Sequence, residues 1–237
     1  MEQKKLNSNT AVVIMFGPPG AGKGTQAELL AEHLGLYHFE TSKIIEEALN
    51  SHTDQEYIEI DGVKYLYKDE RRKFSSGELN SPPIVAFWVK ERIRNLAQKG
   101  QPTVFSGSPR TTFEADQIYP FLISLFPKEA ICVLELTVPS QTSIDRNVAR
   151  RICSSCRLPH PKNYDKITCR RCGNALMLRG SIDTEPVIIK RLGEFALRTM
   201  PAVERTKEYG FAVNVIDGNK DEQSVFKDIC VACKLNI

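Results

Sequence analysis

The chain has 237 residues, of which 41% are hydrophobic and 26% are charged, and its formal net charge is +3. A chain of this length can bury a full core, either as one large domain or as a core that carries small insertions. Its longest apolar run, Val12 to Phe16, is far shorter than the roughly 20 residues that span a bilayer, and MEQKKLNSNT lacks a secretion signal. We therefore expect a cytoplasmic protein with no membrane segment.

Short apolar runs alternate with amphipathic stretches along the chain. The pairs are AVVIMF with TQAELLAEHL, TVFSG with TFEADQIYPFLISL, AICVLELTV with SQTSIDRNVARR, and FAVNVID with DEQSVFKDICVA. Alternating strand and helix signals are typical of crossover units, in which parallel strands form a sheet with helices on both faces. The sequence therefore predicts a three-layer α/β fold with a parallel β-sheet core.

The stretch FGPPGAGKGTQ, residues 16–26, links the first predicted strand to the first predicted helix. Its glycines allow backbone N–H groups to turn toward a phosphate, the helix N-terminus adds partial positive charge, and Lys23 can reach terminal phosphates. The pattern G-x-x-x-x-G-K runs from Gly17 to Lys23, with the hydroxyl one residue late, at Thr25. It predicts a phosphate-binding loop, and a glycine-rich turn without a ligand is the alternative.

Two segments interrupt the alternation of strands and helices. Between residues 50 and 77, EYIEIDGVKYLY has period-two alternation on both sides of Asp61-Gly62, which predicts a β-hairpin. A bare ribbon of that length is marginally stable, so we expect its apolar side chains to pack within the chain. The second interruption spans residues 151–182. Both are predicted to be excursions from one core, because the alternation resumes after each.

The second excursion contains two CxxC pairs separated by twelve residues. Their members are Cys153, Cys156, Cys169 and Cys172. Two such loops can place four thiolates around one Zn²⁺, and in a chain without a secretion signal they favour metal over disulfides. The alternatives are unrelated surface thiols, or a catalytic zinc in which His160 replaces one thiolate.

The surroundings of these cysteines are basic, which is also compatible with a nucleic-acid-binding zinc ribbon. Tyr164 is the only aromatic residue in the excursion, however, so base stacking has little support and phosphate handling is favoured. A third pair, Cys230 and Cys233, lies at i and i+3 in the final predicted helix. We expect both to be small buried residues, and Cys132 to be a core residue.

The loop GPPGAGKGTQ resembles that of adenylate kinases, within the nucleoside monophosphate kinases, which have Gly-Thr after the lysine. The resemblance covers most of the chain, because SGELNSPPIVAFWVKERI, GSPRT, Asp145 to Arg151, DTEPVIIKRL and VIDGNK keep the family's order. It implies transfer of the terminal phosphate of ATP to AMP, with magnesium. It also implies a monomer with a core, a monophosphate-binding arm and a lid that closes over ATP, similar to the zinc-bearing lids of many bacterial adenylate kinases.

The resemblance divides the chain into five consecutive parts. They are core at 1–40, the monophosphate-binding arm with its hairpin insertion at 41–80, core at 81–150, the zinc lid at 151–182, and core at 183–237. Zinc is expected to stiffen a lid that has too little apolar core of its own.

The resemblance also implies three sets of site residues. For ATP they are Gly17, Pro18, Pro19, Gly20, Ala21, Gly22, Lys23, Gly24, Thr25, Arg146 and Lys220, the last two bracketing the adenine. For AMP they are Thr41, Glu78, Leu79, Asn80, Gly107, Arg110, Glu114 and Arg191. The cations around the transferring phosphoryl group are Lys23, Arg110, Arg150, Arg179 and Arg191.

One departure from the family's pattern concerns the acceptor phosphate. The family has Thr-Gly-Asp, two apolar residues and then an arginine that grips this phosphate, whereas TSKIIE has Lys43 and Glu46 at the charged positions. Glu46 would repel a phosphate, so a cation from residues 71–73 is expected to compensate. Alternatively, the helix is shifted and Glu46 faces water.

Two further departures concern the acceptor base and magnesium. Glu114 replaces a glutamine, and an ionised carboxylate can only accept hydrogen bonds, which suits guanine; a protonated one could serve adenine. Alternatively, Glu114 is an acid favoured by the helix N-terminus. Ser106 replaces the aspartate that holds magnesium through its waters, so weaker use of magnesium is expected.

The departures leave two alternatives to an adenylate kinase-like activity. One is a kinase of the same fold whose acceptor is another monophosphate such as GMP, favoured by Glu46 and Glu114. The other is a non-enzymatic ATP-binding zinc protein that has lost phosphate transfer, favoured by Ser106 and Glu46.

Overall fold

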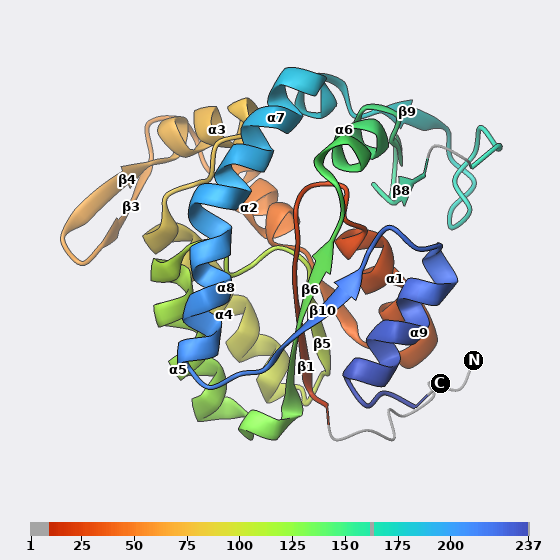
Figure 1. Cartoon of the computed structure of the whole chain (residues 1–237). Coiled ribbons are helices and arrows are strands. Elements are labelled where there is room, and N and C mark those ends of the chain that lie inside the picture. Colours follow the sequence, from red (N-terminus) through yellow and green to blue (C-terminus); the bar gives the residue numbers. More distant parts are fainter. Residues whose placement is uncertain (1–9, 162–163, 237) are drawn as a thin grey trace.

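The computed structural model describes residues 10–161 and 164–236 (Figure 1). Five parallel strands form its central sheet in the order β10-β6-β1-β5-β2. They are β1 (Val12–Phe16), β2 (Tyr37–Phe39), β5 (Thr103–Phe105), β6 (Ile131–Thr137) and β10 (Val213–Asp217). The predicted parallel α/β fold is confirmed.

Helices cover both faces of this sheet. Helices α1 (Lys23–Leu34) and α9 (Glu222–Ala232) pack on one face, and α4 (Pro82–Gln98), α5 (Thr112–Leu125) and α8 (Met200–Glu208) pack on the other. The alternation along β1 explains the two cores, because Val13 and Met15 join the α1–α9 cluster whereas Ile14 and Phe16 join the α4–α5–α8 cluster. Both faces of β1 are therefore buried, and its sequence is one apolar run without alternating polar residues.

The first excursion rises beside the carboxyl ends of the strands. It consists of α2 (Thr41–Asn50), β3 (Tyr57–Ile60), β4 (Val63–Leu66) and α3 (Tyr67–Ser76). Asp61 and Gly62 both have positive φ, 51° and 77°, as a two-residue type I′ hairpin turn requires. The predicted hairpin is confirmed.

The expected packing of the hairpin holds for only some of its apolar side chains. Ile58, Ile60 and Tyr65 lie against the main core. Tyr57 and Leu66, which pair with each other across the two strands, are 48% and 43% exposed. The ribbon is therefore anchored through one face.

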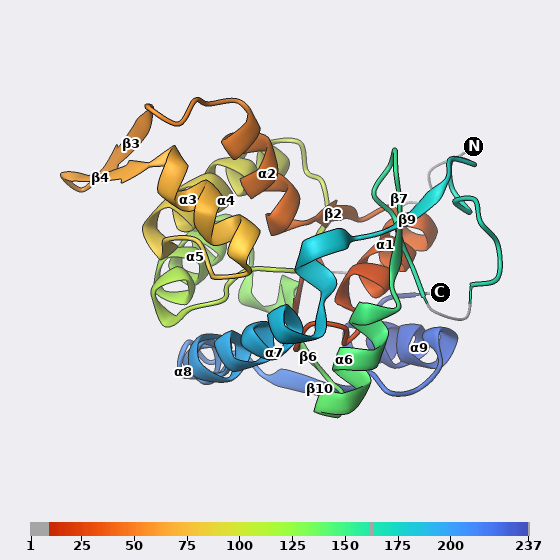
Figure 2. The same cartoon turned by 90° about the horizontal axis from the view of Figure 1, so that it is seen from above.

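The second excursion lies on the opposite side of the strand ends (Figure 2). It leaves the core through α6 (Ser140–Val148), forms the small sheet β8-β7-β9 (Pro159–His160, Arg151–Cys153 and Leu176–Leu178), and returns through the 3₁₀ helix Gly180–Asp183 and α7 (Glu185–Glu194). A π-helical turn, Phe195–Thr199, joins α7 to α8, and a 3₁₀ turn, Lys128–Ala130, precedes β6.

Two cysteines differ from the sequence prediction. Cys132 on β6 and Cys233 at the end of α9 form a disulfide, with Cα atoms 5.4 Å apart, so they are not separate core thiols. Cys230 is the buried free thiol that was predicted, and burial raises its pKa to about 11. The bonded cysteines are 101 residues apart in sequence, so only the packing of α9 on the sheet brings them together.

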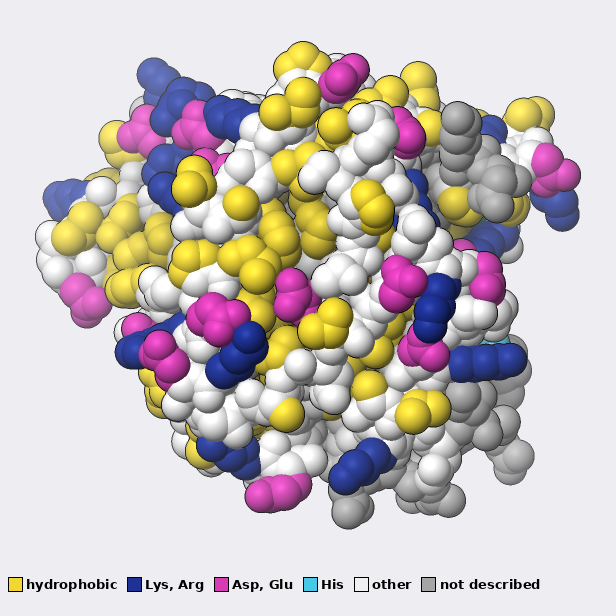
Figure 3. All heavy atoms as spheres, viewed as in Figure 1, with side chains coloured by type: hydrophobic (Ala, Val, Ile, Leu, Met, Phe, Trp, Pro, Cys, Tyr) yellow, Lys and Arg dark blue, Asp and Glu magenta, His cyan; other side chains and the backbone are white. Residues whose placement is uncertain are grey.

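Charged side chains of both signs are interspersed over the face shown in Figure 3. This mixture agrees with the small net charge of +3. Among the helices that the structure describes, none has the length and apolar character needed to cross a membrane.

Candidate active site

The predicted phosphate loop connects β1 to α1. Its backbone depends on glycine at two close approaches, because a Cβ at Gly17 (φ 143°) would lie 2.5 Å from the Leu136 carbonyl oxygen, and one at Gly20 (φ 77°) 2.5 Å from Asn147 Nδ2. Lys23 is the first residue of α1, and its Nζ donates to the carbonyl oxygens of Gly17 at 2.5 Å and Pro18 at 2.9 Å. The ammonium group therefore lies inside the curve of the loop.

Two cavities open on this loop, of about 780 Å³ and about 170 Å³. Of the predicted ATP residues, the larger cavity is lined by Pro19, Gly20, Ala21, Gly22, Lys23, Gly24, Thr25, Arg146 and Lys220, whereas Gly17 lines the smaller cavity and Pro18 lines neither. The smaller cavity is lined by every predicted AMP residue: Thr41, Glu78, Leu79, Asn80, Gly107, Arg110, Glu114 and Arg191. Two regions that are distant in sequence thus form adjoining compartments.

Cations mark the junction between the cavities. Lys23, Arg110, Arg179 and Arg191 line both of them, and Arg150 lines the larger one. Burial, together with the neighbouring charges of Arg110, Arg191 and Arg150, lowers the pKa of Lys23 to about 7. Burial and then Arg150 and Arg179 lower the pKa of Arg191 to about 10. Such crowding of positive charge is unfavourable without a bound anion.

One buried carboxylate partly neutralises this cluster. Asp183 is 6% exposed and accepts hydrogen bonds from Arg150 Nη2 at 2.7 Å and Arg150 Nε at 3.0 Å, and from Arg191 Nη1 at 3.3 Å. It follows the second excursion directly and holds Arg150, which precedes that excursion, and Arg191, which follows it. A phosphate entering the junction would compete with Asp183 for these guanidinium groups.

The loop after β5 places Arg110 against the backbone. A Cβ at Gly107 would lie 3.0 Å from Arg110 Nη2 and 3.3 Å from the Thr41 side chain, so glycine lets both groups approach. Burial lowers the pKa of Arg110, and Glu114 opposes this effect. The guanidinium group is thus held at the wall that separates the two cavities.

Glu114 belongs structurally to the start of α5. Thr111 accepts from the Glu114 N–H at 3.1 Å, while the Glu114 carboxylate accepts from the Arg110 N–H at 2.8 Å and from Ser108 Oγ at 3.0 Å. Burial raises the pKa of this carboxyl group despite these hydrogen bonds. The helix-terminus interpretation is confirmed, although Glu114 also lines the smaller cavity.

Glu46 faces the larger cavity from α2 and has no ion-pair or hydrogen-bond partner within residues 10–161 and 164–236. The cations expected to compensate for it are engaged elsewhere. Arg71 pairs with Asp54, Arg72 lies 3.7 Å from Glu78, and Lys73 lies 2.8 Å from Glu70. None of the three lines either cavity, so this part of the prediction is wrong.

Ser106 stands at the carboxyl end of β5, and its connection to His38 and, through His38, to Glu28 was missed in the sequence. His38 on β2 places Nε2 2.7 Å from Ser106 Oγ and Nδ1 2.8 Å from Glu28 Oε1. Glu28 on α1 also accepts from Arg171 of the cysteine excursion. No local pattern signals this connection, because it depends on the pairing of β2 with β5.

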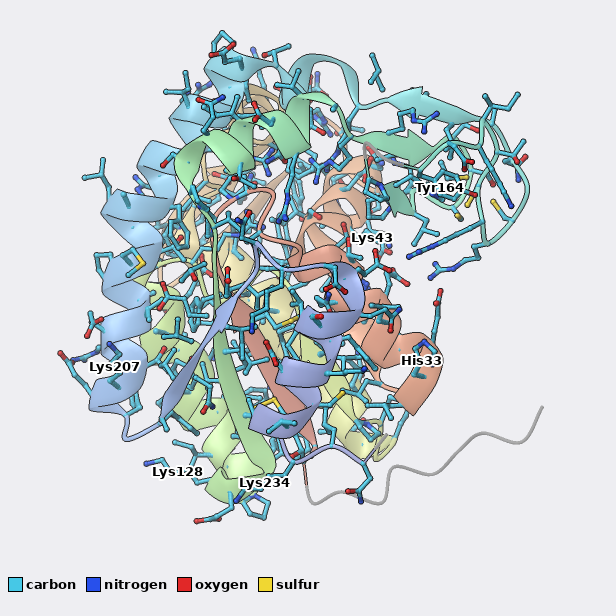
Figure 4. The ribbon with its side chains drawn as sticks, turned by 45° about the vertical axis from the view of Figure 1, so that its right-hand side comes forward. His33, Lys43, Lys128, Tyr164, Lys207 and Lys234 are labelled. Carbon is cyan, nitrogen blue, oxygen red and sulfur yellow. A yellow bond between two sulfur atoms is a disulfide. The ribbon has the colours of Figure 1, made fainter. Side chains whose placement is uncertain are left out.

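The four predicted zinc ligands come together at the tip of the second excursion, where sulfur atoms lie beside Tyr164 in Figure 4. The ligand atoms of Cys153, Cys156, Cys169 and Cys172 all lie within 4.8 Å of one another. Sulfur–sulfur distances of 3.3, 3.5 and 3.6 Å approach the about 3.8 Å edge of a tetrahedron with Zn–S bonds of about 2.3 Å. The donor set therefore fits a closed tetrahedral metal site.

Backbone groups support the same interpretation. The N–H groups of Ser155 and Cys156 point to Cys153 Sγ at 3.4 Å, and the N–H of Arg171 points to Cys169 Sγ at 3.4 Å. These bonds favour thiolates, the form that binds a metal. His160 is buried but is not a member of the cysteine cluster, so a zinc site with His160 in place of a thiolate has no support.

The parallel sheet, its phosphate loop and the ring of cations between two compartments define a phosphate-loop phosphotransferase with separate donor and acceptor pockets, the class to which nucleoside monophosphate kinases belong. A family model described as "Adenylate kinase" matches residues 15–210. The chain belongs to the adenylate kinase family.

Named relatives resemble the chain over nearly its whole length. The adenylate kinase of Syntrophomonas wolfei is 31% identical over 221 residues, covering 92% of this chain and 96% of the relative. Those of Thermoanaerobacter sp. strain X514 and Archaeoglobus fulgidus are 32% and 30% identical over 223 and 224 residues, each covering 92% of this chain and 95% of the relative.

Proposed function

We propose that this protein transfers the terminal phosphate of ATP to AMP and so forms two molecules of ADP. The observation that carries the proposal is the junction at which Lys23, Arg110, Arg179 and Arg191 line both cavities. A phosphoryl group passing between two bound nucleotides needs positive charge on both sides of its path. Family membership supports the same reaction.

The two cavities suit different nucleotides. We assign ATP to the larger one, with its phosphates on the loop amides and Lys23 and its adenine between Arg146 and Lys220. Arg146 is well placed for this role because its Nη1 donates to the Gly218 carbonyl at 2.8 Å, which fixes the guanidinium group at the cavity wall. AMP is assigned to the smaller cavity, beside Thr41 and the backbone of residues 78–80.

Catalysis in this proposal is positioning and charge neutralisation. Arg110 holds the acceptor phosphate, while Lys23, Arg150, Arg179 and Arg191 surround the phosphoryl group in transit. Magnesium bound with ATP would neutralise phosphate charge. Asp183 releases Arg150 and Arg191 toward the phosphates and holds them when no phosphate is present.

We also propose the domains and domain functions that the resemblance implies. Residues 41–80 bind the monophosphate, residues 151–182 form a lid held by structural zinc, and the remainder is the core. Cytoplasmic location and a monomeric state stay predictions, and gel filtration of the purified protein tests the second.

One assay distinguishes this proposal from the two alternatives, a different acceptor monophosphate and a protein without phosphate transfer. Purified protein is mixed with ATP and magnesium and with AMP, GMP, CMP, UMP or no acceptor, and ADP formation is followed. We expect rapid turnover with AMP alone. Turnover only with another monophosphate would support the acceptor alternative, and ATP binding without turnover would support the non-enzymatic one; family membership favours neither.

The uncompensated Glu46 predicts a weak acceptor site. Glu46→Arg should lower the KM for AMP by about tenfold, because it replaces repulsion of a phosphate with a charge-assisted contact of about 1.5 kcal/mol. Glu46 lines the cavity assigned to ATP, so the KM for ATP should fall as well. Glu47→Arg on the exposed side of α2 makes the same charge change but also breaks the ion pair with Arg92, so its folding is checked by thermal denaturation. An equal effect on KM in both variants would show that Glu46 acts only through the overall charge.

Because Ser106 has no charge, we predict that the site binds magnesium weakly. Ser106→Asp should lower the magnesium concentration needed for half-maximal activity several-fold, since a carboxylate binds metal-bound waters more strongly than a neutral hydroxyl. Activity measured against free magnesium at constant ATP gives the result. An unchanged magnesium profile would show that the strand end does not contact the metal's waters.

A further inference from the structure

Glu28, His38 and Ser106 form a hydrogen-bonded chain that ends in the larger cavity. Burial raises the pKa of Glu28, but hydrogen bonds from His38 and Arg171 outweigh it and lower the pKa to about 2. An ionised carboxylate only accepts, so His38 Nδ1 carries a proton and donates to Glu28 over 2.8 Å. In the tautomer that carries its proton on Nδ1, His38 Nε2 accepts from the Ser106 hydroxyl over 2.7 Å.

These three groups have the arrangement of an activated nucleophile. A hydroxyl lies within hydrogen-bond reach of a base, and the base is oriented by a third, ionised group. Ser106 and His38 both line the larger cavity, together with Lys23 and Arg110. Because Ser106 Oγ donates its proton to the imidazole, the lone pairs of this oxygen are available to that cavity.

We propose that Ser106 is itself a phosphoryl acceptor when ATP is bound and no monophosphate is present. The bond between Ser106 Oγ and the γ-phosphorus forms, and the bond from that phosphorus to the β–γ bridging oxygen breaks. ADP leaves with the electron pair, and the hydroxyl proton moves to His38 Nε2. The products are phosphoserine, ADP and an imidazolium paired with Glu28. This inference rests on the proposed function, because it requires ATP in the larger cavity.

The surroundings favour Ser106 over another serine in the same cavity. Ser42 lines both cavities, but its hydroxyl donates to the Glu40 carboxylate at 2.9 Å. Burial raises the pKa of Glu40, but the charge and hydrogen bond of Lys43 and the hydrogen bond from Ser42 contribute to a net lowering, so this carboxylate is a weak base. Ser42 therefore provides a matched control with a hydroxyl but no activating imidazole.

The product also fits its environment. Phosphoserine carries about two negative charges at neutral pH, and Lys23, Arg110 and Arg150 line the cavity into which Ser106 faces. The charge would appear at the strand end where the resemblance places an aspartate. Modification would thus convert a neutral residue into an acidic one at that position.

The test uses the full chain with magnesium and ATP and without any monophosphate, followed by intact mass measurement and peptide mapping. We expect one added phosphoryl group, located on Ser106, and an equal amount of ADP. Ser106→Ala should show none, and peptide mapping of the unchanged protein should find no phosphoryl group on Ser42. His38→Gln should slow labelling by about 100-fold, the lower range for loss of a general base.

Two further measurements separate a catalytic base from a structural contact. In His38→Ala, imidazole added to the buffer should restore part of the labelling rate, which a structural role would not produce. Glu28 is a positioning residue, so Glu28→Gln should slow labelling in the unchanged background but have no further effect on the labelling rate in His38→Gln. Thermal denaturation of each variant reports its folding separately.

The outcomes are distinguishable from those for the proposed function. No phosphoserine at position 106, with ATP–AMP turnover intact, overturns this inference alone. No phosphoserine and no turnover overturn both. Labelling of Ser106 that persists unchanged in His38→Gln also overturns it, because the imidazole is then not the base.

Discussion

Lys23→Met should reduce kcat/KM for ATP by about 100- to 1,000-fold, the usual effect of removing a donor that stabilises transition-state charge. The same substitution should raise the melting temperature. Both effects have one origin: the ammonium group is buried and lies among Arg110, Arg191 and Arg150, where it suits a phosphate but is unfavourable without one. Activity and stability should therefore change in opposite directions.

The sign of the stability effect follows from the pKa of Lys23. Folding lowers it from 10.5 to about 7, so the folded protein binds this proton less tightly than the unfolded chain. The charged lysine costs stability in full below about pH 7, and the cost shrinks as the pH rises toward the unfolded pKa. Methionine also loses two hydrogen bonds to loop carbonyls. A net gain on the order of 1 kcal/mol would raise the melting temperature at neutral pH by about 2–4 °C.

Lys207→Met on α8 is the control, because Lys207 is exposed and pairs only with Glu204 among the described residues. It should leave activity and melting temperature nearly unchanged. A Lys23→Met variant that loses activity and melts well below the unchanged protein would show that the loop needs the lysine for folding. That result would contradict the account of a strained cation cluster.

Binding of ATP should be accompanied by proton uptake above neutral pH. In the protein without nucleotide, Lys23 is largely neutral at about pH 8 because its pKa is about 7. A bound phosphate favours the charged form of this lysine. Calorimetry in buffers of different ionisation enthalpy should therefore show uptake of up to one proton at about pH 8 and little at about pH 6. Equal uptake at both pH values would contradict this assignment.

Loss of zinc should destabilise the protein more than it changes the chemistry of the folded molecule. The part of residues 151–182 that the structure describes has a small apolar core, with a buried cluster of Cys153, Leu158 and Cys169. Without metal these residues cannot offset the entropy of ordering the module. Cys156→Ser should lower the free energy of unfolding by about 4 kcal/mol, the stabilisation expected from zinc at about 1,000 times its Kd. The melting temperature should fall by about 8–16 °C.

The control for this substitution lies in the same turn. Ser154→Ala removes an exposed hydroxyl. The backbone N–H of Ser154 donates to the Ala175 carbonyl oxygen, and the substitution leaves this hydrogen bond in place. This variant should keep its zinc and its melting temperature. Metal analysis of the freshly purified, unchanged protein should give one zinc per chain, and clearly less than one would contradict the assignment. Four sulfur ligands leave no position for substrate, so turnover at low temperature should change less than stability.

Much of the fold was predictable because its signals are local. Alternating strand and helix patterns, the Asp61-Gly62 turn and the paired CxxC motifs each depend on neighbouring residues, and the structure confirms all three. The disulfide between Cys132 and Cys233 was not predictable. It depends on which face of β6 packs against α9, and the sequence of either element does not specify that.

The site shows the same contrast. The phosphate loop is a contiguous motif, whereas the junction depends on Arg110, Arg179 and Arg191, which come from three separate segments. The connection from Glu28 through His38 to Ser106 joins α1, β2 and the end of β5, and no spacing in the sequence marks it. Residues 71–73, just beyond the hairpin, were predicted to compensate for Glu46, but in the structure they pair with other carboxylates.

Incubation with magnesium and ADP alone tests the central claim most directly, because the reaction then requires both cavities to hold nucleotides and the junction between them to transfer phosphate. Followed by phosphorus NMR, the purified protein should convert ADP into equal amounts of ATP and AMP until equilibrium is reached. ADP that remains unchanged, or that yields phosphate without ATP, would contradict the assignment of two adjoining nucleotide sites.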